Sequence, residues 1–258
     1  MEKRSSIDFD GFILDVVKNK KDGWDDTAYP FNLPAVRSWE RLNLHEKVTF
    51  FVGENGTGKS TLTEAIAVAA GFNAEGGSAN FNFTTEKAHS DLHSFLRLGK
   101  GVKRWKTGFF LRAESYFNVA TNIDVLDRDP DNWGPPIIDS YGGTSLHKQS
   151  HGESFMSLMQ HRFGKSGLYI LDEPEAALSP SRQLSFIARL HDLVSQGCQF
   201  IIATHSPILL AYPNSWIYEF TQDGVRRAEW NSLEHVDLTR QFLNHPKSFL
   251  DVLMEDEE

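Results

Sequence analysis

One segment constrains the fold of this chain more than any other, namely Gly53-Glu54-Asn55-Gly56-Thr57-Gly58-Lys59-Ser60. A short apolar run, Val48 to Val52, precedes it, and the residues from Lys59 to Ala70 are typical of a helix that ends at Gly71. The sequence therefore predicts a buried strand, a glycine-rich loop and a helix in direct succession. Glycines let backbone N–H groups turn inward, and the helix adds the positive end of its dipole. Such a loop is suited to hold phosphate oxygens.

The residue types of this phosphate-binding loop, residues 53–60, predict ATP and Mg²⁺ as its ligands. We expect Lys59 to place its charge on the β- and γ-phosphates and the Ser60 hydroxyl to coordinate Mg²⁺, with Thr61 in support. The alternative, a glycine-rich turn that binds nothing, is disfavoured because both the pattern and its flanking elements match. The predicted nucleotide-binding residues are Gly53, Glu54, Asn55, Gly56, Thr57, Gly58, Lys59, Ser60 and Thr61.

Two carboxylates follow a second apolar run, Leu168 to Leu171. Phosphoryl transfer needs an acid on the metal side and a group that orients the attacking water. Asp172 is the candidate Mg²⁺ residue, and Glu173 is the candidate base or water-positioning residue. In a parallel α/β sheet, ligands bind at the carboxyl ends of the strands. An acidic strand end that is merely solvated is the alternative interpretation.

A histidine stands at the end of a third predicted strand, Gln199 to Ala203. If this strand lies parallel beside the other two, its end faces the same cleft. His205 would then contact the γ-phosphate and the attacking water, and we take it as a second candidate catalytic residue. A lone histidine is more often structural or exposed, so the prediction depends on the position of the strand.

The remaining pattern predicts a mixed α/β fold in which strands alternate with helices, which favours a parallel, helix-covered sheet. Strands are expected at 9–17, at 108–113 and in a hairpin around 222–224. Ser179 and Pro180 start a helix that is expected to bury one face. A last helix is expected from about Asp237 to Met254, with a break near Pro246. The expected buried face of the Pro180 helix consists of Leu184, Ile187, Leu190 and Val194.

Composition excludes several classes of protein. The formal net charge of -9 excludes a uniformly basic nucleic-acid coat. Cys198 is the only cysteine, which excludes a disulfide framework and a cysteine-based zinc site. No run approaches the roughly 18 apolar residues of a membrane span. We expect a cytoplasmic protein without membrane insertion.

The phosphate-binding loop, Asp172-Glu173-Pro174 and Thr204-His205-Ser206, in this order, resemble the motifs of the ABC-ATPase superfamily. The resemblance implies a signature motif before the acidic strand, and residues 149–153 occupy that place. Their sequence, Gln149-Ser150-His151-Gly152-Glu153, stands where the usual pattern is Leu-Ser-Gly-Gly-Gln. The resemblance further implies that ATP is held between two subunits of a head-to-tail homodimer. Ser150, Gly152 and Glu153 would bind the nucleotide of the other subunit.

Departures from the transporter form of the family narrow the resemblance. A glutamate at the last position of the signature motif, here Glu153, is similar to the SMC/RecF-type branch and to compact bacterial ATPases. The long coiled coil of SMC proteins is missing, because the interval from Thr61 to Ser150 is too short for it. No glutamine occurs between Thr61 and His147, so the glutamine of the family's Q-loop is missing. Glu114 is the nearest substitute and a candidate Mg²⁺ residue.

The resemblance implies a P-loop NTPase with a RecA-like core sheet, that is, a single ABC-type domain over residues 1–258. A small helical lobe is expected at about 115–165. The implied function is an ATP-hydrolysing, dimeric clamp in DNA repair, DNA maintenance or phage defence, with an unknown protein partner. An ATP-gated interaction switch that does not hydrolyse ATP is the main alternative, and a transporter's nucleotide-binding subunit is a weaker one.

Two further features leave alternatives open. Tyr29 and Phe31 are candidates to stack on the adenine, although core packing is the simpler role for each. Basic residues surround Trp105 and could bind a nucleic acid, which makes nucleic acid a candidate partner. A solvated hairpin is the alternative for this cluster, which consists of Arg97, Lys100, Lys103, Arg104 and Lys106.

Overall fold

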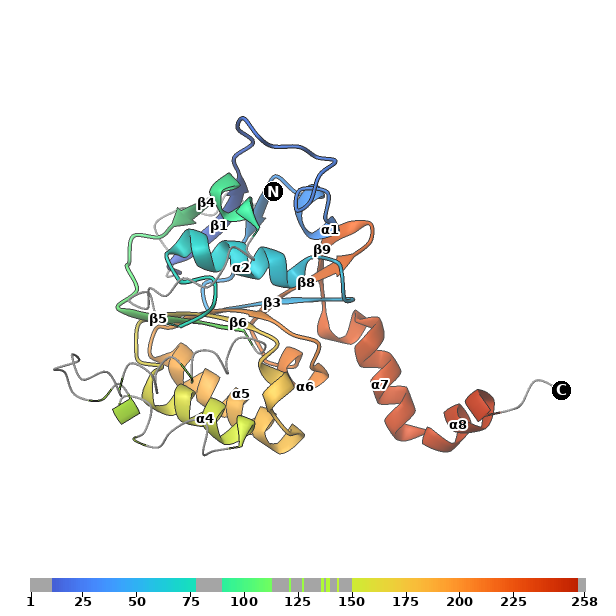
Figure 1. Ribbon diagram of the computed structural model, residues 1–258. Coiled ribbons are helices and arrows are strands. Elements are labelled where there is room, and N and C mark those ends of the chain that lie inside the picture. Colours follow the sequence, from blue (N-terminus) through green and yellow to red (C-terminus); the bar gives the residue numbers. More distant parts are fainter. Residues whose placement is uncertain are drawn as a thin grey trace.

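The computed structural model describes residues 11–77, 90–112 and 150–254, together with the single residues 121, 127, 136, 138, 139 and 143. Six of the described strands form one sheet, in the order β5-β6-β7-β3-β8-β9 (Figure 1). Their bounds are β3 Val48–Gly53, β5 Thr107–Arg112, β6 Gly167–Asp172, β7 Gln199–Ala203, β8 Trp216–Thr221 and β9 Gly224–Ala228.

The sheet is parallel apart from one edge. β5, β6, β7, β3 and β8 pair in parallel, whereas β9 forms an antiparallel hairpin with β8. Every residue of β6 and β7 is buried, as expected for parallel strands that are covered on both faces. The predicted α/β fold with a parallel core sheet is therefore confirmed, and β7 lies between β6 and β3 as the histidine prediction requires.

Helices cover both faces of this sheet (Figure 1). α2 (Lys59–Ala70) lies on one face, and α4 (His151–His161), α5 (Pro180–Ser195) and α6 (Pro207–Leu210) lie on the other. Each face has its own hydrophobic cluster. The phosphate-binding loop joins β3 to the first of these layers, so its position relative to the sheet is set by buried packing on α2.

A second, antiparallel sheet has the order β2-β1-β4 and lies on the α2 side. Its strands are β1 Ile13–Lys18, β2 Arg41–Asn43 and β4 Leu96–Lys100. Gln199 ties it to the core sheet, because its side-chain oxygen accepts from the N–H groups of Phe12 and Ile13, both at 2.9 Å. Its side-chain nitrogen also donates to the Ile13 carbonyl at 2.8 Å.

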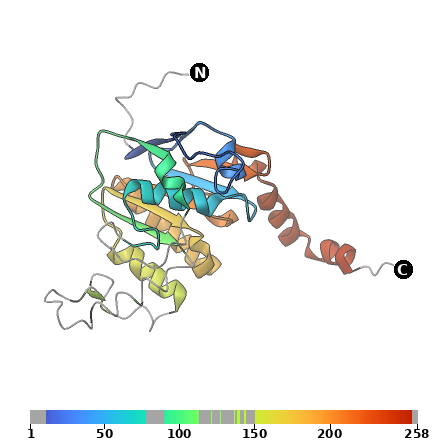
Figure 2. The same cartoon turned by 45° about the horizontal axis from the view of Figure 1, so that its top comes forward.

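Short elements connect these layers. They are α1 (Pro34–Arg37) and the 3₁₀ turns at Asp91–Phe95, Pro174–Ala177 and Trp230–Ser232. The chain then continues into α7 (Glu234–Asn244) and α8 (Pro246–Met254), which extend away from the sheets in both views (Figures 1 and 2). Among the described residues, no helix is long and apolar enough to cross a membrane.

Most expected elements are present with bounds shifted by a few residues. α2 and β7 have the expected bounds, and the helix break at Pro246 is confirmed. The strand expected from Phe9 begins at Ile13, and residues before 11 lie outside the described part. The proposed helical lobe at 115–165 stays a prediction, because most of it also lies outside the described part.

The expected buried face of α5 is wrong in part. Leu184 is 61% exposed, whereas Phe186 is 1% exposed. Ile187 and Val194 pack against the cluster while only partly buried. Compared with the prediction, the helix is rotated about its axis so that Phe186 faces the core. The buried residues of α5 are Gln183, Phe186, Leu190 and Leu193.

This rotation predicts opposite outcomes for two substitutions on α5. Phe186→Ala should lower the free energy of unfolding by about 3–5 kcal/mol, because it leaves a cavity in the core. Leu184→Ala should change it by less than about 0.5 kcal/mol, because that side chain is solvated. Urea unfolding followed by circular dichroism measures both. Equal losses for the two variants would contradict the observed helix orientation.

Candidate functional site

The phosphate-binding loop leaves β3 at the edge of the sheet where the parallel strands end. Gly53 has a φ of 147° and lies against β8, where a Cβ would overlap the carbonyl oxygen of Phe220. Gly58 caps α2 with a φ of 95°. Both positions need glycine, because residues other than glycine rarely adopt a positive φ. The loop backbone thus turns sharply into the N-terminus of α2.

Lys59 lies inside the curve of this loop and is 5% exposed. Its ammonium donates to the carbonyls of Gly53 at 2.6 Å and Glu54 at 2.8 Å. Burial lowers the pKa of Lys59, and the neighbouring carboxylates, first among them those of Glu173 and Asp172, act in the opposite direction. The site therefore holds a buried cation that faces two acidic side chains from another strand.

Ser60 and Asp172 meet at the start of α2 and the end of β6. The Ser60 hydroxyl donates to Asp172 Oδ1 at 3.1 Å. Asp172 is 5% exposed, and burial raises its pKa to about 6, against the opposing effects of Arg112 and the Ser60 hydrogen bond. A hydroxyl and a carboxylate side by side are oxygen ligands of the kind that Mg²⁺ takes, with nucleotide phosphates and water completing its shell. These two residues fit the predicted metal position.

Glu173 and His205 lie together beside this pair. Glu173 has a left-handed backbone, with a φ of 53°, and its N–H donates to the Ala203 carbonyl at 2.9 Å. That bond fixes the end of β6 against the end of β7. His205 Nε2 lies 3.6 Å from Glu173 Oε1. Burial and then the charge of Lys59 lower the pKa of His205, whereas Glu173 raises it.

Register explains why these side chains converge. Ala203 on β7 is the partner of Phe51 on β3 and of Asp172 on β6. β6 and β7 therefore end level with one another, β3 continues to Gly53, and the residues that follow each strand lie at one edge of the sheet. The predicted residues of the loop, the acidic strand and the histidine are brought together by this alignment.

Three charged residues at this edge were missed by the sequence argument. Glu175 accepts from the His205 N–H through Oε1 at 2.5 Å, and burial raises its pKa. Arg112 ends β5 and lies beside Asp172, with Nε 3.9 Å from Oδ2. Arg112 also donates to Glu64 of α2 at 2.6 Å. Neither Glu64 nor Arg112 belongs to a recognisable motif, so no sequence signal identifies them.

The signature residues stand at the N-terminus of α4, on the opposite face of the sheet from α2 (Figure 1). Ser150 caps the helix, and Glu153 returns its carboxylate to the Ser150 N–H at 3.0 Å and hydroxyl at 2.7 Å. Arg182 of α5 donates to both side chains at 3.2 Å. A Cβ on Gly152 would come within 2.8 Å of the Ala177 carbonyl, so glycine permits close packing on the 3₁₀ turn.

The two candidates for adenine stacking have different surroundings. Phe31 is 6% exposed, and its ring centroid lies 4.4 Å from that of Trp24 and 4.9 Å from that of Phe95. This core packing opposes a role for Phe31 at the adenine, whereas Tyr29 is 64% exposed. Glu114 and Gln149 lie outside the described residues.

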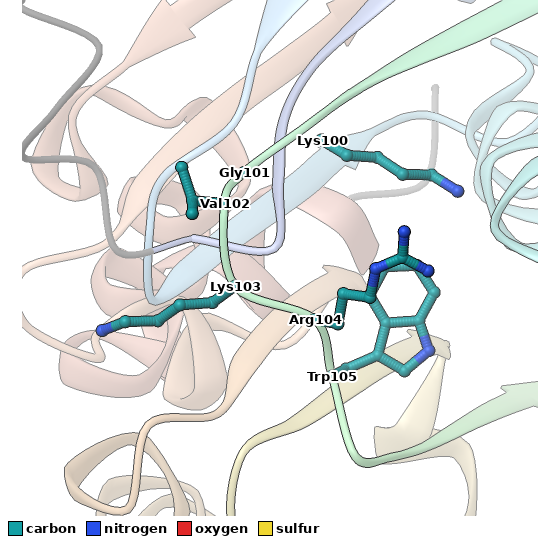
Figure 3. A pocket seen from close by; sticks show the side chains of 6 residues that line it. All are labelled: Lys100, Gly101, Val102, Lys103, Arg104 and Trp105. Carbon is teal, nitrogen blue, oxygen red and sulfur yellow. The ribbon is translucent and has the colours of Figure 1, made fainter.

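Three residues of the basic cluster, Lys100, Lys103 and Arg104, line a hollow of about 430 Å³ together with Trp105 at the end of β4 (Figure 3). Lys100, Arg104 and Trp105 extend to the same side of the chain, whereas Lys103 points to the other side (Figure 3). The Lys100 ammonium lies 5.5 Å from the Trp105 ring centroid. The predicted cluster is therefore divided between the two sides of the chain.

Two family models match this chain. A model described as "AAA domain" matches residues 32–114, and a model described as "AAA domain, putative AbiEii toxin, Type IV TA system" matches residues 154–211. The first segment contains the phosphate-binding loop and Arg112, and the second contains Asp172, Glu173 and His205.

Solved structures show a weak likeness over most of the chain. The SMC head domain from Thermotoga maritima is 15% identical, with 73% of this chain and 93% of that chain covered and a TM-score of 0.41. The cbiO1 protein from Clostridium perfringens, part of the ABC transporter complex cbiONQ, is 18% identical, with 95% and 99% covered and a TM-score of 0.49.

The charges around His205 predict two opposite shifts of its pKa. Lys59→Met should raise the pKa of His205, because it removes a positive charge that disfavours the imidazolium. Glu173→Gln should lower it further, because it removes a neighbouring carboxylate that favours the charged ring. An NMR titration of the His205 ring protons measures both, and shifts of the same sign would contradict the geometry.

Proposed function

Because this chain belongs to the ABC/AAA ATPase superfamily, we propose that it binds ATP with Mg²⁺ at the edge described above and hydrolyses it. One observation supports this most strongly. A buried lysine, a serine–aspartate pair and a glutamate–histidine pair lie at or just after the ends of three neighbouring parallel strands and meet at one site. These are the cation, the metal ligands and the water-orienting groups that phosphoryl transfer requires.

The phosphates would be held by the backbone N–H groups of residues 53–60 and by Lys59. Ser60 and Asp172 would hold Mg²⁺, which would neutralise charge on the β- and γ-phosphates. Glu173 would orient a water molecule and take its proton as the water oxygen bonds to the γ-phosphorus. The bond between the γ-phosphorus and the bridging oxygen breaks, and ADP leaves with that electron pair. His205 would hold the same water and the γ-phosphate.

The site is proposed to be completed by a second copy of this chain. The family resemblance supports a head-to-tail homodimer in which Ser150, Gly152 and Glu153 approach the γ-phosphate from the partner. The N-terminus of α4 offers backbone N–H groups and the positive end of a helix dipole, which suit a phosphate. Closure with ATP and reopening after hydrolysis would make the dimer a clamp, acting in DNA repair, DNA maintenance or phage defence.

The catalytic assignment predicts a selective defect in one variant. Glu173→Gln should lower the ATP turnover rate by about 10²–10⁴-fold, as the loss of a general base does. It should retain ATP binding and accumulate as an ATP-bound dimer. Steady-state phosphate release and size-exclusion chromatography with ATP measure these effects.

Lys59→Ala is the matched control, because it should weaken nucleotide binding itself. Normal turnover in Glu173→Gln would remove Glu173 from the mechanism. Negligible turnover in the unaltered protein, together with ATP-dependent dimers, would favour the alternative of a non-hydrolysing switch. A transporter subunit is less well supported, since the Q-loop glutamine is missing from the interval between Thr61 and His147.

We propose the Trp105 hollow as the surface that meets single-stranded nucleic acid. The Trp105 ring could stack on a base while Lys100 and Arg104 contact phosphates. Residues 97–106 hold five basic residues and no acidic one in a chain whose net charge is -9, so this segment, which leads from β4 to β5, is locally positive. Ion pairs for Lys100 and Arg104 are absent within the part of the chain that the structure describes.

The divided cluster gives this proposal a matched control. A variant with both Lys100→Ala and Arg104→Ala should bind single-stranded DNA more weakly and reduce the slope of log affinity against log salt by roughly 1.4. Lys103→Ala should have a smaller effect, because that side chain extends to the opposite side of the chain from Lys100, Arg104 and Trp105. Fluorescence anisotropy over a salt series measures the slopes. Undetectable binding at low salt, or equal effects of the variants, would reject this surface.

A further inference from the structure

Four side chains form a series of contacts that begins at the proposed Mg²⁺ ligands Ser60 and Asp172. Ser60 donates to Asp172 Oδ1 at 3.1 Å, and Asp172 Oδ2 faces Arg112 Nε at 3.9 Å. Arg112 Nη1 donates to Glu64 Oε2 at 2.6 Å. Glu64 lies one helical turn after Ser60 on α2, so the first and the last residue of this series belong to the same helix. Each oxygen of Asp172 thus has its own neighbour, a hydroxyl on one side and a guanidinium on the other.

The charged side chains in this series are largely buried. The side chains of Glu64, Asp172 and Arg112 are 9%, 7% and 22% exposed. The Arg112 guanidinium therefore lies beside two carboxylates that have little contact with water. Buried carboxylates need a partner, because burial removes the water that stabilises their charge. The Arg112 guanidinium supplies part of that compensation to both carboxylates.

The same carboxylates and the Ser60 hydroxyl are oxygen ligands of the type that Mg²⁺ and Mn²⁺ prefer. Among the residues that the structure describes, no group of three or more His, Cys, Asp or Glu side chains is arranged to hold a metal ion by itself. A Mg²⁺ ion bound through one or two carboxylates normally depends on substrate phosphates for the rest of its shell. Arg112 adds a positive charge beside Asp172, one of the proposed Mg²⁺ ligands.

We propose that Arg112 keeps the Ser60–Asp172 site from taking up a divalent cation before a nucleotide arrives. The guanidinium repels a bare cation and occupies Glu64, so that the ion is held only when nucleotide phosphates contribute further negative charge. The inference rests on the proposed function, because Ser60 and Asp172 are the metal ligands assigned there. Arg112 would thus determine that the nucleotide binds before the divalent cation, which is a role separate from any contribution to folding.

Substitutions at Arg112 separate charge from structure. Arg112→Gln removes the charge and retains hydrogen-bonding capacity. It should bind Mn²⁺, without nucleotide, on the order of tenfold more tightly than the unaltered protein. Arg112→Lys keeps the charge and loses the planar fork, so it should show no such gain. The double variant with Arg112→Gln and Glu64→Gln should lose the gain, because the second carboxylate is gone.

Electron paramagnetic resonance of added Mn²⁺ measures these affinities in the full chain, and calorimetric titration with Mg²⁺ repeats the measurement. No gain in Arg112→Gln, or an equal gain in Arg112→Lys, overturns the proposal. Circular dichroism reports whether each variant is folded. If Arg112→Gln does not fold, Glu64→Gln remains decisive. It keeps the guanidinium and removes a carboxylate, so it should weaken Mn²⁺ binding to the ATP-loaded protein, and an unchanged affinity overturns the proposal.

Failure of this inference is distinguishable from failure of the proposed function. ATP binding to the unaltered protein in EDTA tests the phosphate-binding loop without any metal. If ATP does not bind there, the proposed function fails, whatever Arg112 does. If ATP binds and the nucleotide-free Mn²⁺ affinity is the same in all Arg112 variants, only the present inference fails.

Discussion

The site depends on the parallel pairing of β3, β7 and β6. Their register aligns Phe51, Ala203 and Asp172, so three segments far apart in sequence emerge side by side at one edge of the sheet. The bond from the Glu173 N–H to the Ala203 carbonyl extends this alignment past the end of β6. A shift of one strand by one residue would move each of its side chains to the opposite face of the sheet. Because both faces of β6 and β7 are buried in packed clusters, such a shift would disrupt both clusters, and the core therefore determines the geometry of the edge.

Burial also determines the electrostatics of that edge. Lys59 and Asp172 are each 5% exposed. Because burial favours the neutral form of each group, it lowers the pKa of Lys59 and raises that of Asp172. Charges of opposite sign from adjacent elements act against this effect. A triphosphate with Mg²⁺ adds both negative and positive charge to the same space. Without a ligand, only a few side chains compensate the buried charges of this site. A bound triphosphate with Mg²⁺ would add to that compensation.

The sequence predicted the parts of this site that follow local rules. The glycine pattern, the apolar runs before Asp172 and His205, and the cap at Ser179 each depend on a few neighbouring residues. Arg112, Glu64 and Glu175 depend on which strand lies next to which, and a single sequence does not contain that order. The face of α5 was missed for a related reason: several apolar residues could be buried, and the opposing helix and sheet select Phe186 over Leu184.

The signature segment illustrates how one residue can serve local and intermolecular needs. Glu153 caps its own helix through Ser150, and Arg182 of α5 contacts both. These contacts hold the N-terminus of α4 in a fixed position and leave Ser150 exposed. A glutamine at this place would retain the capping hydrogen bonds but lose the charge that meets Arg182. The glutamate therefore strengthens the link between α4 and α5, and through Gly152 this rigid unit packs on the turn that follows Glu173. Motion of a partner against the N-terminus of α4 would in this way be transmitted to the residue proposed to orient the attacking water.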